Sequence, residues 1–172
     1  MKQIHPSPAN LHCHMLRGNQ PGNNLGQVMN YRAAEDKDIQ HIRELLDSLG
    51  LPSADVDGRT QRFFVAESAE ELAGVGGIET LGCIGLIRSI AVAPRHRGRG
   101  VAANLYRLLE KHARDSGIGT LYLLTETAQG YFRSHGFSVQ ERETIPIPMK
   151  ETNQFSRLCS SSATVMRKVL SE

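Results

Sequence analysis

The stretch Ile90-Ala91-Val92-Ala93-Pro94-Arg95-His96-Arg97-Gly98-Arg99-Gly100-Val101-Ala102-Ala103 decides the fold of this chain. An apolar, β-branched strand ends at a proline, a basic loop with two glycines follows, and an amphipathic helix then begins. A helix N-terminus preceded by glycines presents free backbone N–H groups to an anion such as a pyrophosphate. The three arginines of the loop add positive charge at the same place. The stretch therefore predicts a loop that holds a phosphorylated ligand.

The spacing of this loop excludes two well-known phosphate-binding motifs. The loop lacks the Gly-Lys-Ser/Thr of a Walker A motif, and Ala103 stands where a dinucleotide fingerprint needs its third glycine. What remains is Arg-x-x-Gly-x-Gly before a small, apolar helix start. A purely structural turn or a generic anion loop stays the alternative at this point.

Length and composition indicate one domain whose partner is a small molecule. The chain has 172 residues and a formal net charge of +2, so neither nucleic acid nor a membrane surface is favoured as a partner. The basic residues gather between Arg88 and Asp115, which suits a small polyanion. No apolar run has the length of a membrane span, and no signal pattern is present. The cysteines Cys13, Cys83 and Cys159 are far apart, so we expect a cytoplasmic protein without disulfides, with Cys83 and Cys159 buried as small apolar residues.

The composition changes near residue 28. Residues 1–27 are rich in Pro, Asn, Gln, Gly and His, and such a stretch buries too little apolar surface to offset its ordering entropy. We expect a flexible N-terminal extension there and a folded domain over residues 28–172. The group His5, His12, Cys13 and His14 lacks a complete four-ligand spacing, so no metal is expected.

From residue 28 onward, strand-like and helix-like patterns alternate. They predict strands at 28–34, 62–67, 71–79, 84–93, 121–125, 137–141 and 163–170, and helices at 35–49, 101–117 and 128–135. Residues 50–60 are a polar loop or a short second helix, and prolines 146 and 148 indicate a loop before the last strand. The order predicts an α/β (α+β) fold, a mixed sheet of about six to seven strands flanked by about four helices.

This order resembles the GCN5-related N-acetyltransferase (GNAT) superfamily across residues 28–170. Its acetyl-CoA motif, Arg/Gln-x-x-Gly-x-Gly/Ala, is matched by Arg95, Gly98 and Gly100, and residues 128–137 (AQGYFRSHGF) are similar to its helix-plus-Gly-Phe segment. Segments 85–92, 121–125 and 155–163 resemble a GNAT subgroup encoded with arsenic-resistance operons, although Ser160 stands where that subgroup often has proline.

The resemblance implies acetyl-CoA as the cosubstrate and a direct transfer mechanism. A neutral amine attacks the thioester carbonyl, an oxyanion forms, and the CoA thiolate leaves. A strand pairs with the pantetheine arm and offers an oxyanion donor, and loop amides cradle the pyrophosphate. The implied cofactor-binding residues are Ile90, Ala91 and Val92 for the arm, and Arg95, Arg97, Gly98, Arg99, Gly100, Val101 and Ala102 for the pyrophosphate.

The catalytic and substrate-binding residues are less sharply specified. Glu79, near a strand end, is the candidate general base, with a solvated carboxylate as the alternative. Arg88 is a candidate fork for an acid group of the substrate, and an internal salt bridge is an equal alternative. Thr125 takes the position where many family members have asparagine, and Phe132 takes that of the usual tyrosine. Tyr131 is then a candidate acid for the thiolate, although it lies about 100° further round the helix. Thr125, which is also a candidate substrate-binding residue, water, or release of the thiolate without an acid are the alternatives.

We therefore expect an N-acetyltransferase that acetylates the primary amine of a small, anionic, amino-acid-like compound, with resistance to an arsenic-containing or related toxicant as its specific role. A catalytically inactive acyl-CoA-binding module is one alternative, because the usual tyrosine is missing. A peptide or protein N-acetyltransferase is another. A homodimer through the C-terminal strands stays open.

Overall fold

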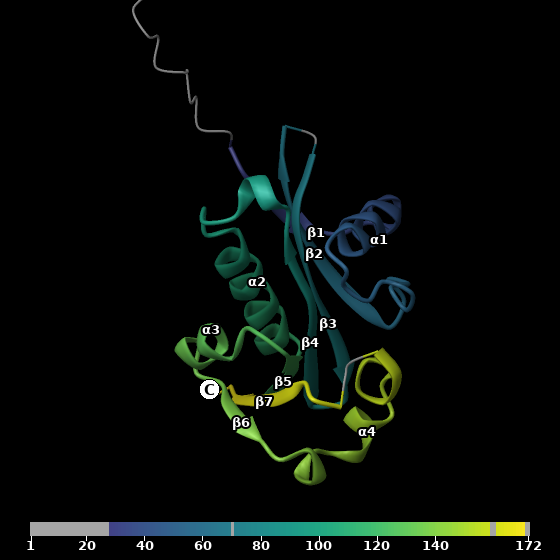
Figure 1. Cartoon of the computed structure of the whole chain (residues 1–172), viewed down its shortest axis with the longest axis vertical. Coiled ribbons are helices and arrows are strands. Elements are labelled where there is room, and N and C mark those ends of the chain that lie inside the picture. The colour runs from purple at the N-terminus through teal and green to yellow at the C-terminus, as the bar shows by residue number, and fades with distance from the viewer. Residues whose placement is uncertain (1–27, 70, 159–160, 171–172) are drawn as a thin grey trace, which may run out of the picture.

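The computed structural model describes residues 28–69, 71–158 and 161–170. The expected extension at 1–27, the group of histidines within it, and Cys159 lie outside these ranges. The described strands form one sheet in the order β1-β2-β3-β4-β5-β7-β6 (Figure 1). They are β1 (Asn30–Ala33), β2 (Gln61–Ser68), β3 (Glu71–Leu81), β4 (Ile84–Val92), β5 (Thr120–Thr125), β6 (Ser138–Gln140) and β7 (Thr164–Val169).

Four α-helices accompany the sheet in the described part of the chain: α1 (Ile39–Ser48), α2 (Val101–Asp115), α3 (Gln129–Ser134) and α4 (Ile147–Lys150). Short 3-10 turns cover Asp36–Asp38, Pro94–His96 and Arg142–Thr144, and a π-helical turn covers Gln154–Leu158. The predicted order of strands and helices is confirmed apart from α4, which lies where a loop was predicted, and the mixed α/β fold is confirmed.

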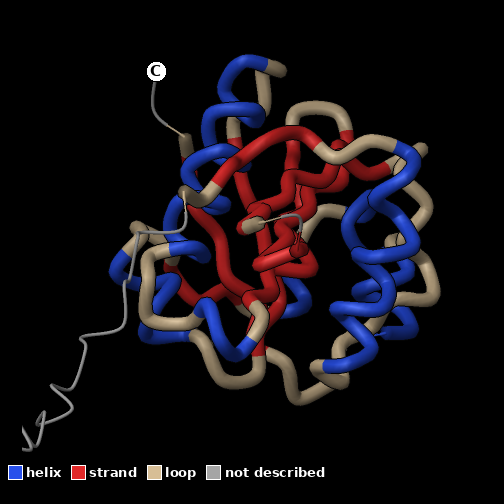
Figure 2. Tube along the Cα trace, turned by 90° about the horizontal axis from the view of Figure 1, so that it is seen from above, coloured by secondary structure: helices blue, strands red, loops and turns tan. Residues whose placement is uncertain are grey.

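Helices α1 and α2 cover opposite faces of the sheet (Figures 1 and 2). Ile42 and Leu46 of α1 pack with Val65 of β2, whereas Leu105 of α2 packs with Ala66, the next residue of the same strand. Adjacent strand residues point to opposite faces, so the two helices are separated by the sheet. The apolar faces of the two helices therefore belong to two separate hydrophobic cores.

Glycines of β3 allow α2 to approach the sheet closely. A Cβ atom on Gly76 would lie 2.9 Å from Leu109 Cδ1, and one on Gly74 would lie 3.0 Å from Val101 Cγ1. Either contact would push α2 outward. These glycines therefore fix the position of α2 and, with it, the position of the loop that precedes the helix.

Strands β4 and β5 form the only parallel pair among the described strands, and they separate partway along. Their pairing runs from Ile84↔Thr120 to Ile87↔Leu123. Just beyond, β4 bulges against β3, because the register passes from Gly77↔Arg88 to Val75↔Ala91. Ser89, within this bulge, has a φ of 54°, a left-handed conformation that is uncommon for a residue with a side chain. Strands β4 and β5 therefore separate beyond Arg88, toward the C-terminal end of β4.

Three local predictions need correction or refinement. Residues 51–60 form a loop without helix, held by Arg43 Nε donating to the Val56 carbonyl at 2.9 Å. The expected loop around prolines 146 and 148 contains α4 and the π-helical turn, because Ile145 and Met149 are buried and a proline is tolerated in a first helical turn. The prediction that Cys83 is buried is wrong: it is exposed, beside Gly82 in the β3–β4 turn.

None of the helices described is long and apolar enough to cross a membrane.

Candidate active site

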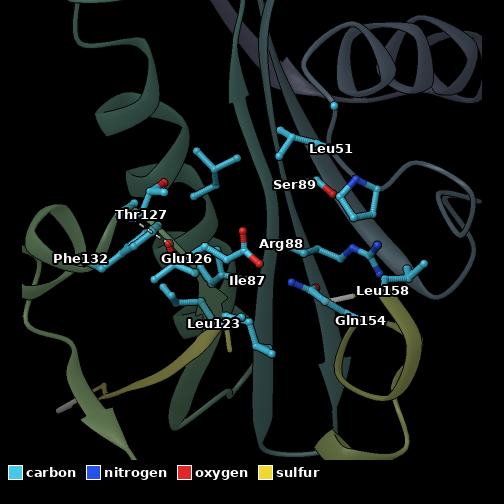
Figure 3. A pocket seen from close by; sticks show the side chains of 17 residues that line it. Leu51, Ile87, Arg88, Ser89, Leu123, Glu126, Thr127, Phe132, Gln154 and Leu158 are labelled. Atoms are coloured by element: carbon cyan, nitrogen blue, oxygen red, sulfur yellow. Dashed lines mark hydrogen bonds between the residues drawn. The ribbon is translucent and has the colours of Figure 1, made fainter. Parts of the chain in front are cut away.

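A pocket of about 450 Å³ opens where β4 and β5 separate (Figure 3). Its walls are formed by the bulged part of β4, the end of β5 with the loop into α3 and α3 itself, the loop after α1, the π-helical turn, and the residue before β7. The lining residues used below are Arg88, Thr125, Glu126, Phe132, Gln154 and Leu158. The pocket is therefore built from segments that lie far apart in the sequence.

The part of β4 that follows Ile87 offers an unpaired backbone edge to this pocket. The ladder with β5 ends at Ile87, so within the described chain no strand pairs with β4 on that side beyond this residue. Ile90 lines the pocket, whereas Ala91 packs in the core beneath α1 and Val92 packs against the start of α2. An extended ligand could therefore add to β4 along this edge, as the sequence predicted for the pantetheine arm.

The glycine loop leads directly into α2. Gly100 is the N-cap residue with a φ of 75°, and Gly98 has a φ of 73°. A Cβ atom on either glycine would meet nothing within 4 Å, so the backbone conformation, rather than crowding, requires glycine here. No side chain caps the helix. The amides of its first turn, starting with Val101, Ala102 and Ala103, lack intrahelical acceptors and lie at the positive end of the helix dipole.

The phosphate motif fits the chain in two registers. Besides Arg95, Gly98 and Gly100, the pattern Arg/Gln-x-x-Gly-x-Gly/Ala is also met by Arg97, Gly100 and Ala102. The second register places glycine at the N-cap and a small residue at the second helical position, where a longer side chain would cover the amides. Gly98, which only the first register uses, has a positive φ as well, so the backbone is compatible with both registers.

The three arginines of the loop have different surroundings. Arg95 forms an ion pair with Glu71 at 2.8 Å, and Arg97 Nε donates to the Val92 carbonyl at 3.2 Å. Arg99 is exposed on the loop. Arg97 and Arg99 are therefore better candidates for an anion than Arg95, whose charge already has a partner.

Arg88 forms an internal salt bridge, one of the two interpretations that the sequence left open. Its side chain is 2% exposed, and its two terminal nitrogens donate to the two carboxylate oxygens of Asp55 at 2.7 and 2.5 Å. A third contact joins it to Glu79 at 3.4 Å. Two carboxylates thus surround one guanidinium beside the pocket.

Glu79, the predicted base, lies behind Arg88 and is not among the residues that line the pocket. Burial raises the pKa of its carboxyl above the ordinary value, although the charge of Arg88 acts in the opposite direction. Glu79 therefore contacts the pocket only through Arg88 in this arrangement.

Of the three residues predicted near the thioester, two line the pocket and one does not. Thr125 lines the pocket, and its Oγ1 accepts the Ala128 amide at 3.0 Å at the start of α3. Phe132 also lines it. Tyr131 does not: its ring packs on His135 with centroids 4.4 Å apart, and its hydroxyl is buried without a hydrogen-bond partner among the described residues. Burial raises the pKa of that hydroxyl. The structure brings Thr125 and Phe132 together at the pocket and leaves Tyr131 aside.

Sequence reasoning missed three residues of this site. Glu126 follows directly after the predicted strand at 121–125, so its position at a strand end was a usable signal. Asp55 and Gln154 lie in segments predicted as loops, where no periodicity shows which side chains turn inward. Among the residues that the structure describes, no group of three or more His, Cys, Asp or Glu side chains could hold a metal ion.

Comparison with known families places residues 30–137 in a match to the model described as the acetyltransferase (GNAT) family. A comparison with curated protein sequences gives no match. The family match covers the glycine loop and, of the elements that line the pocket, β4, β5, α3 and the loop after α1, whereas the π-helical turn lies outside it.

Several solved structures share this fold. N-acetylglutamate synthase from Neisseria gonorrhoeae, complexed with coenzyme A and N-acetyl-glutamate, superposes with a TM-score of 0.70 and 21% identity, covering 84% of this chain and 36% of that one. The Rv2747 protein from Mycobacterium tuberculosis, in complex with CoA, gives 0.68 and 23%, covering 82% and 99%. PaiA N-acetyltransferase from Thermoplasma acidophilum, also with coenzyme A, gives 0.63 and 13%, covering 83% and 99%. The chain spans about a third of the length of the N-acetylglutamate synthase chains it matches.

Proposed function

Because the chain belongs to the acetyltransferase (GNAT) family, we propose that it transfers the acetyl group of acetyl-CoA to the primary amine of a small molecule bound between β4 and β5. One observation carries the proposal: a single strand connects the two halves of the site. The part of β4 that follows Ile87 lines the pocket with an unpaired edge, and the glycine loop that follows β4 ends at the uncapped N-terminus of α2. A pyrophosphate and a thioester at the two ends of an extended arm fit this layout.

The residues present fit coenzyme A at three places. Amides from Gly98 to Ala102 would hold the pyrophosphate, with Arg97 and Arg99 supplying positive charge. The edge of β4 near Ile90 would bind the pantetheine arm, and one of its amides would donate to the carbonyl oxygen of the thioester. When bound, acetyl-CoA supplies an activated acyl group.

The transfer forms a C–N and an S–H bond and breaks a C–S and an N–H bond. The nitrogen of the neutral amine bonds to the carbonyl carbon, the carbon–sulfur bond breaks, the amine gives up a proton, and the leaving thiolate takes one. For protonation of the thiolate, Thr125 has better support than Tyr131, because of these two only Thr125 lines the pocket. Glu79 is a positioning residue in this proposal, since it acts on Arg88 rather than on the substrate.

The anionic, amino-acid-like acceptor expected from the sequence has limited support. It depended on Arg88 as a fork for an acid group, and the terminal nitrogens of Arg88 are bonded to Asp55. The N-acetyl-glutamate in the Neisseria gonorrhoeae structure keeps an anionic acceptor as a second candidate. A role in arsenic resistance is supported by the sequence resemblance alone.

Two further proposals concern catalysis and assembly. An acyl-CoA-binding module without catalysis is favoured by Phe132 at the usual tyrosine position and by Tyr131 outside the pocket. A homodimer through the C-terminal strands is supported by the exposed apolar side chains of Val139 on β6 and Val169 on β7.

The test of the proposed function is thiol release from acetyl-CoA with a panel of amines, with the acetylated product identified by mass spectrometry. The panel holds ordinary amino acids, diamines, a peptide with a free N-terminus, and phosphinate and arsinate amino acids. We expect thiol release that matches the formation of one N-acetylated amine. Binding of CoA without thiol release from any amine would support the inactive module, and acetylation of the peptide alone would support a protein acceptor.

A further inference from the structure

We propose that the acceptor is a small cationic amine, of the aliphatic diamine class, held by Glu126 and by the side-chain carbonyl of Gln154. This inference rests on the proposed function, because it names the substrate class of the same pocket. It departs from the anionic acceptor that the sequence favoured.

The first step concerns charge. Among the described residues that line the pocket, only Arg88 and Glu126 carry a formal charge. Arg88 is matched by Asp55 and accompanied by Glu79, so this cluster brings no net positive charge to the pocket, whether or not Glu79 holds a proton. Glu126 is exposed, and no other side chain lining the pocket neutralises it. The pocket therefore attracts cations and repels acid groups.

The second step concerns hydrogen bonding. Gln154 is 8% exposed and lines the pocket, yet its Oε1 has no hydrogen-bond partner among the described residues. A buried carbonyl without a donor costs free energy, and a ligand N–H group would remove that cost. Figure 3 shows Glu126 entering from the end of β5 and Gln154 from the π-helical turn. A free carboxylate and a side-chain amide whose buried carbonyl lacks a partner thus line one pocket from separate walls.

Arg88 does not offset this preference. Its Nε is buried and without a partner in the described chain, so it could donate one hydrogen bond to a ligand oxygen. Its terminal nitrogens already bind Asp55. Arg88 therefore cannot form the two parallel hydrogen bonds to a ligand carboxylate that a free guanidinium forms. The binding groups of the pocket therefore favour a donor-rich ligand.

A second nitrogen follows from the reaction itself. The attacking amine must be neutral and becomes an uncharged amide, so its own charge cannot hold the substrate through the transfer. A second ammonium keeps its charge throughout and can remain paired with Glu126. An aliphatic diamine is the simplest molecule with both groups.

The experiment uses three amines with the same four-carbon chain: 1,4-diaminobutane, 1-aminobutane and 4-aminobutanoate. They differ in one end group, which is an ammonium, a methyl or a carboxylate. Equilibrium binding to the CoA-bound protein is measured by saturation-transfer NMR, and kcat/KM is measured by thiol release. We expect the diamine to exceed 4-aminobutanoate about tenfold in both quantities, because the exposed carboxylate of Glu126 attracts the ammonium and repels the carboxylate, and each effect is worth up to about fivefold.

Substitutions assign the effect to the two residues. Glu126→Gln should remove most of the tenfold preference, Glu126→Lys should reverse it toward 4-aminobutanoate, and Gln154→Met should weaken diamine binding. Glu143→Gln, at an exposed carboxylate outside the pocket, should leave the preference unchanged. CoA affinity should be unaltered in all four variants, which shows that each is folded.

The outcomes separate this inference from the proposed function. Tighter binding or faster acetylation of 4-aminobutanoate, or an unchanged preference in Glu126→Gln, would overturn the cationic acceptor and leave the acetyltransferase intact. Absence of CoA binding and of thiol release with every amine would overturn the proposed function itself. The NMR measurement tests diamine binding even where turnover is slow.

Discussion

The guanidinium of Arg88 binds both carboxylate oxygens of Asp55, 33 positions earlier in the chain, at 2.7 and 2.5 Å. Asp55 belongs to the loop between α1 and β2, and Gln61 Nε2 donates to the Asp55 carbonyl at 3.0 Å. The pair therefore fastens that loop to β4 beside the pocket. Arg88 of β4 thereby shapes the wall of the pocket while its terminal nitrogens stay bonded to Asp55.

Replacing Asp55 by alanine should cost stability. The guanidinium would keep only the 3.4 Å contact with Glu79 as an ionic partner while its side chain stays 2% exposed. Loss of one member of a buried ion pair costs about 3 kcal/mol in the free energy of unfolding. Urea unfolding measures it. The matched control is Asp115→Ala, which breaks the exposed pair with Lys111 and should cost less than about 1 kcal/mol. Equal losses in the two variants would contradict a buried clamp.

Glu79 should make stability depend on pH with a defined sign. Burial raises the pKa of its carboxyl above the ordinary value of 4.5. The folded chain then binds this proton more tightly than the unfolded chain, so the contribution of Glu79 is complete below 4.5 and is lost as the pH rises above it. The free energy of unfolding of the wild type, relative to that of Glu79→Gln, should therefore fall as the pH rises from about 4 to about 7. A difference that grows with pH would mean that the ion pair with Arg88 outweighs burial.

Tyr131→Phe should leave turnover nearly unchanged. The hydroxyl is buried, lacks a partner among the described residues and lies outside the pocket lining. Removing an unpaired buried hydroxyl should keep or raise the free energy of unfolding, by up to about 1 kcal/mol. Steady-state thiol release and thermal unfolding are the measurements. A tenfold loss of kcat would place Tyr131 in the mechanism and revive it as the acid.

The β3 glycine opposite Arg88 should tolerate no side chain. A Cβ atom on Gly77 would lie 2.5 Å from Phe63 Cε1 and 2.8 Å from Cδ1. Gly77→Ala should therefore destabilise the fold by about 1–3 kcal/mol. Gly119→Ala is the control, because a Cβ atom there meets nothing within 4 Å. Calorimetric melting of both variants decides it, and equal melting temperatures would show that the contact with Phe63 does not limit the packing of β3 on β2.

The sequence predicted the elements that carry strong periodicity. Leu105 and Leu109 of α2 are fully buried, as their spacing indicated, and the apolar run at 121–123 is a buried strand. The glycine loop was predicted because φ values near +75° and the helix start leave a direct mark on residue choice.

The wall of the pocket could not be predicted in the same way. Asp55 and Gln154 reach the pocket through tertiary contacts of irregular segments, and no local pattern encodes which carboxylate returns to Arg88. The prolines at 146 and 148 indicated a loop. Met149, in the same segment, is nevertheless fully buried. The charge of the pocket depends on these contacts, so the sequence alone did not predict it.

The most direct test of the central claim is the dissociation constant of CoA for the wild type, Gly100→Val and Gly82→Val, measured by isothermal titration calorimetry. Both glycines have positive φ, 75° and 66°, and a Cβ atom on either meets nothing within 4 Å, so the two substitutions impose the same kind of backbone strain. Gly82 lies in the β3–β4 turn, away from the loop. We predict that CoA binding weakens at least about tenfold in Gly100→Val and is unchanged in Gly82→Val. Equal CoA affinity in all three proteins would contradict the assignment of the α2 loop as the pyrophosphate site.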